Sequence, residues 1–276
     1  MDIPSRMISD EFSPEVMRYA SSWCWLRSDF AAEYDELSRS GALREDGGGE
    51  VIWETRKKYV LKLTTSSGRT VAFKSYRRMR KWIYLLHPTP TAREAVNFQR
   101  LAALGVPMVK LLGVGEIRRC FQPEKAFLVT EFALGFRDGR SFCPGGEMAG
   151  EEELRREFCI RNFRLLARLH DHGIIHGGFT PANELWHLPA AADGKGGPME
   201  LAWIDVATCR RCTAGGLQRH IPDDFANFMR FFDFSAEERL ALLREYCDAS
   251  EIVRFTPGEL AEAVDRALAA RTKKRK

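Results

Sequence analysis

The first half of the chain alternates short apolar runs with polar turns, a pattern that predicts a small, mostly antiparallel sheet. We expect strands over residues 51–54, 58–63, 70–74, 109–114 and 126–132. Ser66-Ser67-Gly68 provides the turn between the second and third strands. One helix is expected from Ala92 to Leu104, because prolines precede it and Gly105 and Pro107 follow it.

Residues 1–45, ahead of this sheet, are predicted to form a helical extension. Ser13-Pro14-Glu15 has the N-cap residue and the first-turn proline with which helices often begin. Asp46-Gly47-Gly48-Gly49 then breaks the chain. We therefore expect the sheet-containing lobe to span residues 46–134.

The second half has the longer apolar periodicity of helices. Residues 135–150 are rich in Gly, Pro and polar side chains and are expected to form a loop at the lobe boundary. A long helix follows over about 151–171, then two strands over 185–188 and 200–204, and then further helices.

Two of the last predicted helices begin with capping-box spacing, Ser235 with Glu238 and Thr256 with Glu259. The whole pattern predicts an α+β protein with two lobes. Its expected parts are the extension 1–45, an N-lobe 46–134, the boundary 135–150, a mostly helical C-lobe 151–271 and a basic tail 272–276.

Composition excludes several classes of protein. With 276 residues, 45% hydrophobic and 29% charged, the chain is long enough for two lobes and has ordinary globular composition. No apolar run approaches the roughly 20 residues that span a bilayer, and the first residues lack the apolar core of a signal peptide. Seven scattered cysteines suit a reducing compartment, so a cytoplasmic protein is expected. Cys209-x-x-Cys212 is a lone pair, which argues against structural zinc.

The net charge of +4 is mild but unevenly distributed. Basic residues gather in two clusters. The first is the C-terminal Lys273–Lys276, which we interpret as a solvent-exposed tail without a binding role. The basic residues of the other cluster are Arg77, Arg78, Arg80 and Lys81. They are interleaved with Met79 and Trp82, which favours contact with an anionic membrane surface. Nucleic acid is not an expected partner.

The segment from Leu166 to Leu188 carries the most informative motif. In protein kinases a loop of the form H-x-D-x-x-x-x-N supplies an Asp that accepts the substrate hydroxyl proton and an Asn that holds a metal ion. His176 and Asn183 have this spacing, but Gly178 stands at the position of the Asp. No catalytic base is therefore assigned, and His176 is expected to brace the loop.

A kinase-like site also needs a strand lysine for the phosphates and a helix glutamate to hold that lysine. Lys74 ends the V-A-x-K pattern of Val71-Ala72-Phe73-Lys74. Glu94 follows 20 residues later on the predicted helix. Thr91-Ala92-Arg93-Glu94 also fits a capping box, in which Glu94 would cap its own helix. Pairing with Lys74 is the interpretation that we favour.

Asp205 ends the apolar strand at 201–204, 22 residues after Asn183 and one plausible hairpin away. A kinase Asp at this place binds the metal that bridges the donor phosphates. A strand-end turn is the alternative. We expect Lys74, Glu94, Asn183 and Asp205 to bind ATP, with Asn183 and Asp205 as ligands of Mg²⁺.

These motifs together resemble the bacterial lipopolysaccharide kinases of the Kdo/WaaP family, which belong to the protein-kinase-like superfamily. The resemblance extends from about Gly49 to Tyr246. It includes Gly49–Ile52, Val71–Lys74, Arg93–Ala95, Leu101–Pro107, Leu169–Asn183, Ile204-Asp205, Asp224–Ala226 and Phe234–Tyr246. The resemblance implies a bilobal kinase-like fold, ATP, a divalent metal, and a sugar hydroxyl of a membrane glycolipid as acceptor. It also implies action at the inner face of the cytoplasmic membrane.

The chain departs from kinases in general at two further places. Thr55-Arg56-Lys57, between the first two strands, has no glycine to form a phosphate-covering loop, although backbone amides there could still reach a phosphate. Glu184 enters the next strand where an apolar residue is usual. Glu184 and Asp171 are the carboxylates that might replace the missing Asp, and we disfavour both.

Two functions follow as expectations. The first is phosphotransfer to a glycolipid sugar, slowed by the absence of an Asp at 178. The second is a pseudokinase that acts as a regulatory or scaffold module in envelope biosynthesis. A small-molecule kinase of the aminoglycoside or choline type shares the loop but fits Ile204-Asp205 less well.

Overall fold

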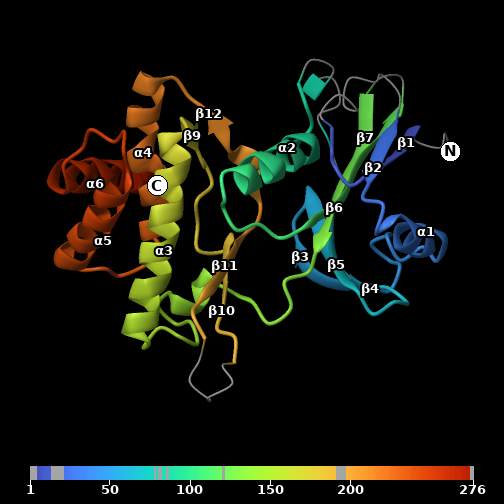
Figure 1. Cartoon of the computed structure of the whole chain (residues 1–276), viewed down its shortest axis with the longest axis horizontal. Helices are drawn as coiled ribbons and strands as arrows, with labels where there is room; N and C mark the ends of the chain where they lie inside the picture. The colour runs from blue at the N-terminus through green and yellow to red at the C-terminus, as the bar shows by residue number, and fades with distance from the viewer. Residues whose placement is uncertain are drawn as a thin grey trace. The chain divides into compact units, whose positions relative to one another are not determined.

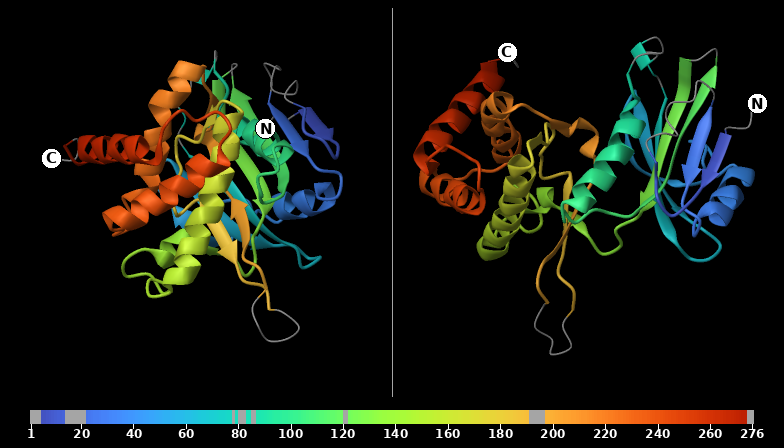
Figure 2. Two further views of the ribbon diagram at one scale, coloured as in Figure 1. Left: turned by 60° about the vertical axis from the view of Figure 1, so that its left-hand side comes forward. Right: turned by 45° about the horizontal axis from the view of Figure 1, so that its top comes forward.

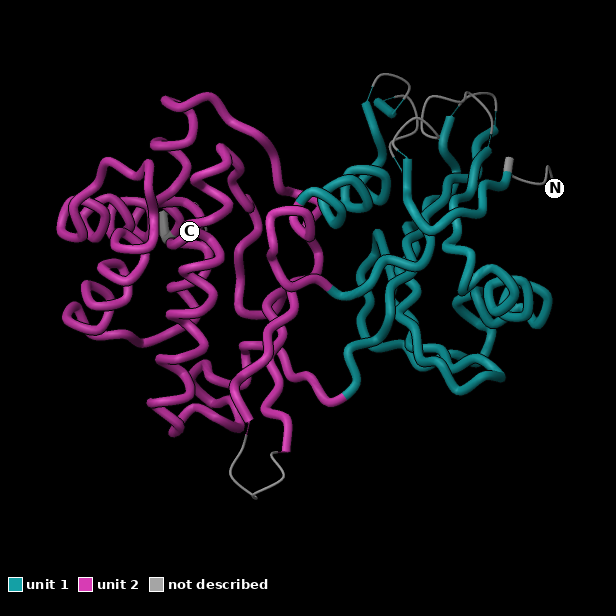
Figure 3. The backbone as a smooth tube through the Cα atoms, in the orientation of Figure 1, with its two compact units in different colours: residues 1–100, 109–134 teal, residues 101–108, 135–276 magenta. Residues whose placement is uncertain are grey.

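The computed structural model describes residues 5–13, 22–77, 79, 83–84, 87–119, 122–190 and 197–273. The chain forms two compact units (Figure 3). Unit 1 contains residues 1–100 and 109–134, and unit 2 contains residues 101–108 and 135–276. The predicted α+β class is confirmed, because unit 1 is built on a sheet and unit 2 is mostly helical.

In the described part of unit 1, seven strands form one sheet in the order β1-β2-β6-β7-β5-β4-β3 (Figure 1). The strands are β1 (Ser5–Ile8), β2 (Trp23–Leu26), β3 (Glu50–Glu54), β4 (Lys58–Thr64), β5 (Thr70–Tyr76), β6 (Leu111–Arg119) and β7 (Gln122–Glu131). β1 runs parallel to β2, and the other neighbouring pairs are antiparallel. The five predicted strands are confirmed, with shifted ends.

The prediction of a helical extension over residues 1–45 is wrong for the described part of that segment. It supplies β1 and β2 to the sheet, and its helix is α1 (Ala31–Arg39). Trp23-Cys24-Trp25-Leu26 is a continuous apolar run with all four residues buried. A short run of this kind fits a strand buried on both faces, and periodicity alone does not separate it from a helix. Pro14 and Glu15 of the predicted N-cap lie outside the described residues.

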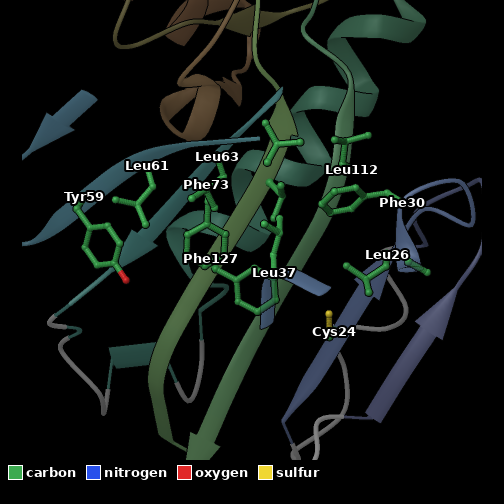
Figure 4. Packing of buried hydrophobic residues seen from close by; sticks show 13 residues of the cluster. Cys24, Leu26, Phe30, Leu37, Tyr59, Leu61, Leu63, Phe73, Leu112 and Phe127 are labelled. Atoms are coloured by element: carbon green, nitrogen blue, oxygen red, sulfur yellow. The ribbon is translucent and has the colours of Figure 1, made fainter. Parts of the chain in front are cut away.

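One hydrophobic core holds α1 against the sheet (Figure 4). Leu37 of α1 is buried together with Leu61 of β4, Phe73 of β5 and Phe127 of β7. The rings of Phe73 and Phe127 stack with their centroids 5.7 Å apart. Because successive side chains of a strand point to opposite faces, this core directs the next residue, Lys74, to the other face of the sheet.

Unit 2 combines short strands with four helices in its described part (Figure 2). The helices are α3 (Glu152–Asp171), α4 (Ala214–Met229), α5 (Ala236–Ala249) and α6 (Pro257–Lys273). The strands are β8 (Arg137–Asp138), β9 (Ile174–Ile175), β10 (Glu184–His187), β11 (Glu200–Trp203) and β12 (Arg210–Arg211), and short 3-10 helices cover η3 (Gly139–Phe142) and η4 (Val206–Thr208). β10 pairs antiparallel with β11 and with β8, and β12 pairs with β9.

Aromatic side chains form the centre of unit 2. Phe163 of α3 packs edge-on against Phe225 of α4, with ring centroids 4.9 Å apart. Phe179 stacks on Phe228 at the same centroid distance. Phe179 belongs to the loop from His176 to Asn183, so this core fixes one side of the loop that carries the kinase-like motif.

The predicted helix starts of the C-terminal half are confirmed. Ser235 and Glu238 exchange both hydrogen bonds of a capping box, and Thr256 and Glu259 do the same. The helix expected from Ala92 to Leu104 is α2 (Pro90–Ala103). Among the described residues, no helix combines the length and apolar character needed to cross a bilayer.

Candidate functional site

Lys74 and Glu94 form a buried ion pair in unit 1. The Lys74 ammonium donates to both carboxylate oxygens of Glu94, at 3.0 and 2.8 Å. The two side chains are only 9% and 2% exposed. A charge this deeply buried is tolerated when a hydrogen-bonded partner neutralises it. The structure therefore brings together the lysine and the glutamate that the sequence offered as a pair.

The alternative for Glu94, a capping box with Thr91, is wrong. The helix N-terminus is capped one residue before α2, where the Thr89 hydroxyl accepts from the Ala92 amide at 3.2 Å. Thr89 also donates to the buried Glu116 carboxylate at 2.5 Å. Glu94 is thus not needed at the helix end, and both of its oxygens face Lys74.

In unit 2, a single buried carboxylate holds the start of the loop that contains Gly178. Asp224 of α4 accepts the backbone amides of His176 at 2.8 Å and Gly177 at 2.7 Å. It also contacts His170 Nε2 at 3.3 Å, and the other ring nitrogen of His170 contacts the Tyr246 hydroxyl at 2.6 Å. Helices α3, α4 and α5 therefore meet at the loop through one carboxylate.

Electrostatics keep Asp224 ionised. Burial alone would raise its pKa, but the hydrogen bond from His170, the nearby imidazoles and the His176 amide together lower the pKa of Asp224. The ionised carboxylate of Asp224 can therefore accept hydrogen bonds from the loop amides and from His170 at the same time. Asp224 was expected only as part of the helical end of the family pattern. The signal that could have identified its role is a carboxylate on the buried face of α4, one residue before the core residue Phe225.

Asn183 and Asp205 lie at the same end of the β10–β11 hairpin. The Asn183 carbonyl accepts the amide of Ile204 at 2.9 Å, and Asp205 is the next residue. The Asn183 side-chain amide donates to the Gly178 carbonyl at 3.0 Å. This hydrogen bond uses the nitrogen of the amide and leaves its oxygen as the atom suited to a cation.

The backbone of Asp205 is held in the left-handed region, with φ 53° and ψ 48°. Within the described ranges it is the one non-glycine residue with positive φ. Such a conformation costs of order 1–3 kcal/mol and persists where the surrounding structure enforces it, often at functional sites. It points to a role for Asp205 beyond ending a strand.

The donor set fits a magnesium–nucleotide site better than a site built by protein ligands alone. Among the described side chains, no group of three or more His, Cys, Asp or Glu residues is arranged to hold a metal ion. Mg²⁺ typically takes one or two carboxylates together with substrate phosphates and water. Asp205 offers one carboxylate and Asn183 offers one amide oxygen from the same end of the hairpin, which is a donor set of that kind.

The space next to Gly178 is already occupied. A Cβ atom added at Gly178 would lie 2.7 Å from the Thr208 hydroxyl oxygen, closer than real Cβ contacts. A Cβ at Gly177 would lie 3.1 Å from the Thr208 carbonyl and 3.5 Å from Arg210 Nη1, and Gly177 has φ +71°. The two glycines thus allow residues 208–210 to lie directly against the loop.

Glu184 is buried beneath the loop and opposite His176. Its Oε1 lies 4.0 Å from His176 Nε2, and none of these atoms has a hydrogen-bond partner among the described residues. Burial raises the pKa of Glu184 well above its ordinary value, which favours the neutral form of this side chain. Burial also lowers the pKa of His176, although Asp224 and Asp205 oppose the change. Because Glu184 is fully buried, it is unsuited to accept a proton from a substrate.

Asp171, the other carboxylate considered for the missing base, has a structural role. It accepts the Ser250 hydroxyl at 2.5 Å and the amides of Glu251 and Ile252. These bonds anchor the turn between α5 and α6. Neither carboxylate that the sequence offered therefore replaces an Asp at 178, as expected.

Two backbone amides at the turn between β3 and β4 are already hydrogen-bonded within the turn. The Thr55 hydroxyl accepts the amides of Lys57 and Lys58, each at 3.2 Å. Those amides are therefore unavailable to a phosphate. The side chains of Arg56 and Lys57 are exposed.

The basic cluster around Arg77 is only partly described. Arg77 pairs with Glu45 and with Glu54, the latter at 2.8 Å, so its charge is neutralised within unit 1. Its partners in the predicted membrane-binding cluster, Arg78, Arg80 and Lys81, lie outside the described residues. Arg77 is thus engaged in ion pairs of its own unit, and the membrane-surface prediction for the cluster stays a prediction.

Comparison with known proteins places the chain in a family. The lipopolysaccharide kinase (Kdo/WaaP) family matches residues 48–246. A solved structure of WaaP in complex with acyl carrier protein superposes with a TM-score of 0.56 and 20% sequence identity, over 87% of this chain and 91% of that chain. A Rio2 kinase–ADP/Mg²⁺–phosphoaspartate complex from Chaetomium thermophilum gives a TM-score of 0.44 and 16% identity, over 90% and 76% of the two chains. No curated protein sequence matches.

Proposed function

The chain belongs to the lipopolysaccharide kinase (Kdo/WaaP) family, and from this premise we propose that it binds Mg-ATP and transfers phosphate to a sugar hydroxyl of a membrane glycolipid. The observation that supports the proposal is the position of Asn183 and the backbone-strained Asp205 at the same end of one hairpin. A carboxylate and an amide oxygen are ligands of the kind that a nucleotide-bound Mg²⁺ takes from a protein.

Each half of the site has a defined task in this proposal. Lys74 would bind the donor phosphates, and Glu94 holds its ammonium in place through two hydrogen bonds. Asn183 and Asp205 would hold Mg²⁺. The bound metal neutralises charge on the phosphates during transfer. Asp224 fixes the loop backbone, and therefore the position of Asn183, without contacting a substrate.

The absence of an Asp at 178 limits the rate and does not exclude the reaction. A general base is typically worth 10²–10⁴-fold, whereas positioning and electrostatic stabilisation supply more of the acceleration in phosphoryl transfer. Since neither Glu184 nor Asp171 replaces the base, we propose slow phosphotransfer in which the hydroxyl proton leaves to solvent.

A pseudokinase is the second candidate, and the packing at Gly178 favours it. Thr208 fills the place of the missing side chain at Gly178, and Arg210 lies next to the neighbouring Gly177. A loop remodelled in this way is compatible with a protein that binds nucleotide and regulates a partner in envelope biosynthesis without turnover.

Thermal shift and turnover separate the two candidates. The melting temperature is measured with and without Mg-ATP, and ATP turnover is then measured for wild type, G178D, T208A and the G178D/T208A double variant. The double variant is needed because Asp at 178 would collide with Thr208. A D205N variant serves as the matched control, since it keeps the shape of the side chain and removes its charge.

Stabilisation by Mg-ATP with turnover in wild type supports the enzyme. Stabilisation with turnover only in the double variant supports the pseudokinase. No stabilisation in wild type, or equal stabilisation in D205N, contradicts the nucleotide site formed by Lys74, Asn183 and Asp205.

A glycolipid acceptor would place the protein in the cytoplasm at the inner face of the membrane, and we propose peripheral association there. The support is the basic cluster Arg78, Arg80 and Lys81, whose structure is not described. Changing these three residues to Glu should abolish co-sedimentation with anionic vesicles, whereas R77A should not. Retained co-sedimentation in the triple variant contradicts this placement.

A further inference from the structure

We propose that Arg210 is an anion-binding residue for the acceptor, and that it recognises a phosphate or carboxylate group close to the reacting hydroxyl. The inference rests on the proposed phosphotransfer and specifies its substrate class. It begins from the position of the guanidinium: Arg210 Nη1 would lie 3.5 Å from a Cβ atom at Gly177, so the group is packed over the catalytic loop.

Arg210 is held in position by a chain of neutral and charged groups. Its Nη2 contacts His220 Nε2 at 3.5 Å, and His220 Nδ1 contacts the Asp223 carboxylate at 3.4 Å. Asp223 in turn accepts from Arg271 at 2.9 Å. Arginine carries only donors, so in this contact His220 Nε2 is the acceptor and the ring proton lies on Nδ1. The tautomer is the one that Asp223 favours.

The guanidinium keeps unused donors. Arginine has five N–H groups in a planar fork that matches phosphate and carboxylate. No ion pair joins Arg210 to a carboxylate in the described part of the chain, in contrast to Arg77, Arg140 and Arg155. The residue is exposed. A guanidinium that is oriented by a neighbour but lacks a counter-ion is suited to bind an anionic ligand.

The location points to the acceptor rather than to ATP. The Asp that kinases carry at position 178 faces the acceptor hydroxyl, whereas Asn183 and the metal serve the donor. In this chain the carboxylate is replaced by Gly178, and Arg210 lies over the neighbouring Gly177. The charge at the acceptor end is thereby changed from negative to positive. An anionic acceptor that a carboxylate would repel is attracted by this arrangement.

Binding is tested without turnover, so that the outcome does not depend on phosphotransfer. The probe is inorganic phosphate, added to the full-length protein in the presence of saturating ADP and Mg²⁺. The readout is the NMR signal of the Arg210 Nε–H group, assigned with an R210K variant. We expect a saturable shift at Arg210 and none at Arg219, an exposed arginine of α4 that serves as the control.

Variants of the supporting residues test positioning. R210K keeps the positive charge but lacks the planar set of N–H donors of a guanidinium, and we expect phosphate binding to weaken about tenfold. H220A and D223N remove the groups that orient Arg210, and they should weaken binding while leaving the melting temperature within the range of the R219A control. G178D/T208A should also weaken binding, because the new carboxylate would pair with Arg210.

A kinetic experiment tests whether the anion that Arg210 binds is a phosphate group of the acceptor rather than free phosphate. With deacylated lipopolysaccharide as acceptor, R210A should raise KM for the acceptor about tenfold and leave KM for ATP unchanged. Phosphatase treatment of the acceptor should remove the difference between R210A and wild type. A rise in KM for ATP instead, or no saturable shift at Arg210, overturns the inference. If the protein binds phosphate at Arg210 but shows no turnover under any condition, the anion-binding role of Arg210 is supported and the proposed phosphotransfer is contradicted.

Discussion

Thr208 occupies the space that a side chain at position 178 would need, with its hydroxyl oxygen 2.7 Å from the place of a Cβ atom on Gly178. The first prediction follows from this contact. G178D should lower the free energy of unfolding by about 1–3 kcal/mol through overpacking. T208A in the same chain should recover most of that loss, as measured by urea denaturation. Equal stability of G178D and G178D/T208A would show that Thr208 turns aside freely.

The second prediction concerns the buried pair of Lys74 and Glu94. K74M leaves the Glu94 carboxylate without its partner, and we expect a loss of about 3–5 kcal/mol in the free energy of unfolding. The K74M/E94L double variant removes both charges and should regain most of the stability, but it should not regain the thermal shift with Mg-ATP. A double variant as unstable as K74M would mean that packing, rather than the unpaired charge, sets the cost.

The third prediction separates strain from metal binding at Asp205. The left-handed backbone at this position suits glycine and not alanine. D205A should therefore be less stable than D205G by about 1 kcal/mol. Both variants should lose the dependence of the thermal shift on Mg²⁺. If D205A and D205G unfold at the same denaturant concentration, the backbone at 205 relaxes on substitution.

The fourth prediction is a pH dependence that arises from Glu184. Its pKa is raised in the folded protein from an ordinary value of 4.5, so the unfolded chain releases this proton first as the pH rises. The contribution of Glu184 is most favourable below pH 4.5 and declines between pH 4.5 and the folded pKa. E184Q should remove that decline and be more stable than wild type at pH 7. Parallel stability–pH profiles of E184Q and wild type, measured by urea denaturation, would contradict a neutral Glu184.

Much of the site was predictable because its motifs are local. Val71–Lys74 indicates a strand that carries the lysine, and the interval from Asn183 to Asp205 contains a hairpin. Strand alternation then dictates that Lys74 faces away from the core formed by Phe73. For this reason the ordered spacing of four residues was enough to place each of them on the right element.

What the sequence could not reveal are contacts between distant segments. Thr208 and Gly178 are separated by a hairpin, and Asp224 reaches the loop from a helix, so no spacing rule connects them. The prediction of a helical extension over residues 1–45 was wrong for a different reason. Trp23–Leu26 is apolar at every position, and its pairing with the neighbouring strands β1 and β6 decides that it is a strand.

The three contacts of Asp224 have a consequence for dynamics. Because the carboxylate joins the loop amides of His176 and Gly177 to His170 of α3, these amides cannot open without disrupting the helical core. They belong to the same cooperative unfolding unit as α3 and α5, and their hydrogen exchange should be as slow as that of the core helices. The loop is thus rigid before any ligand arrives, and binding carries little entropic cost for ordering it.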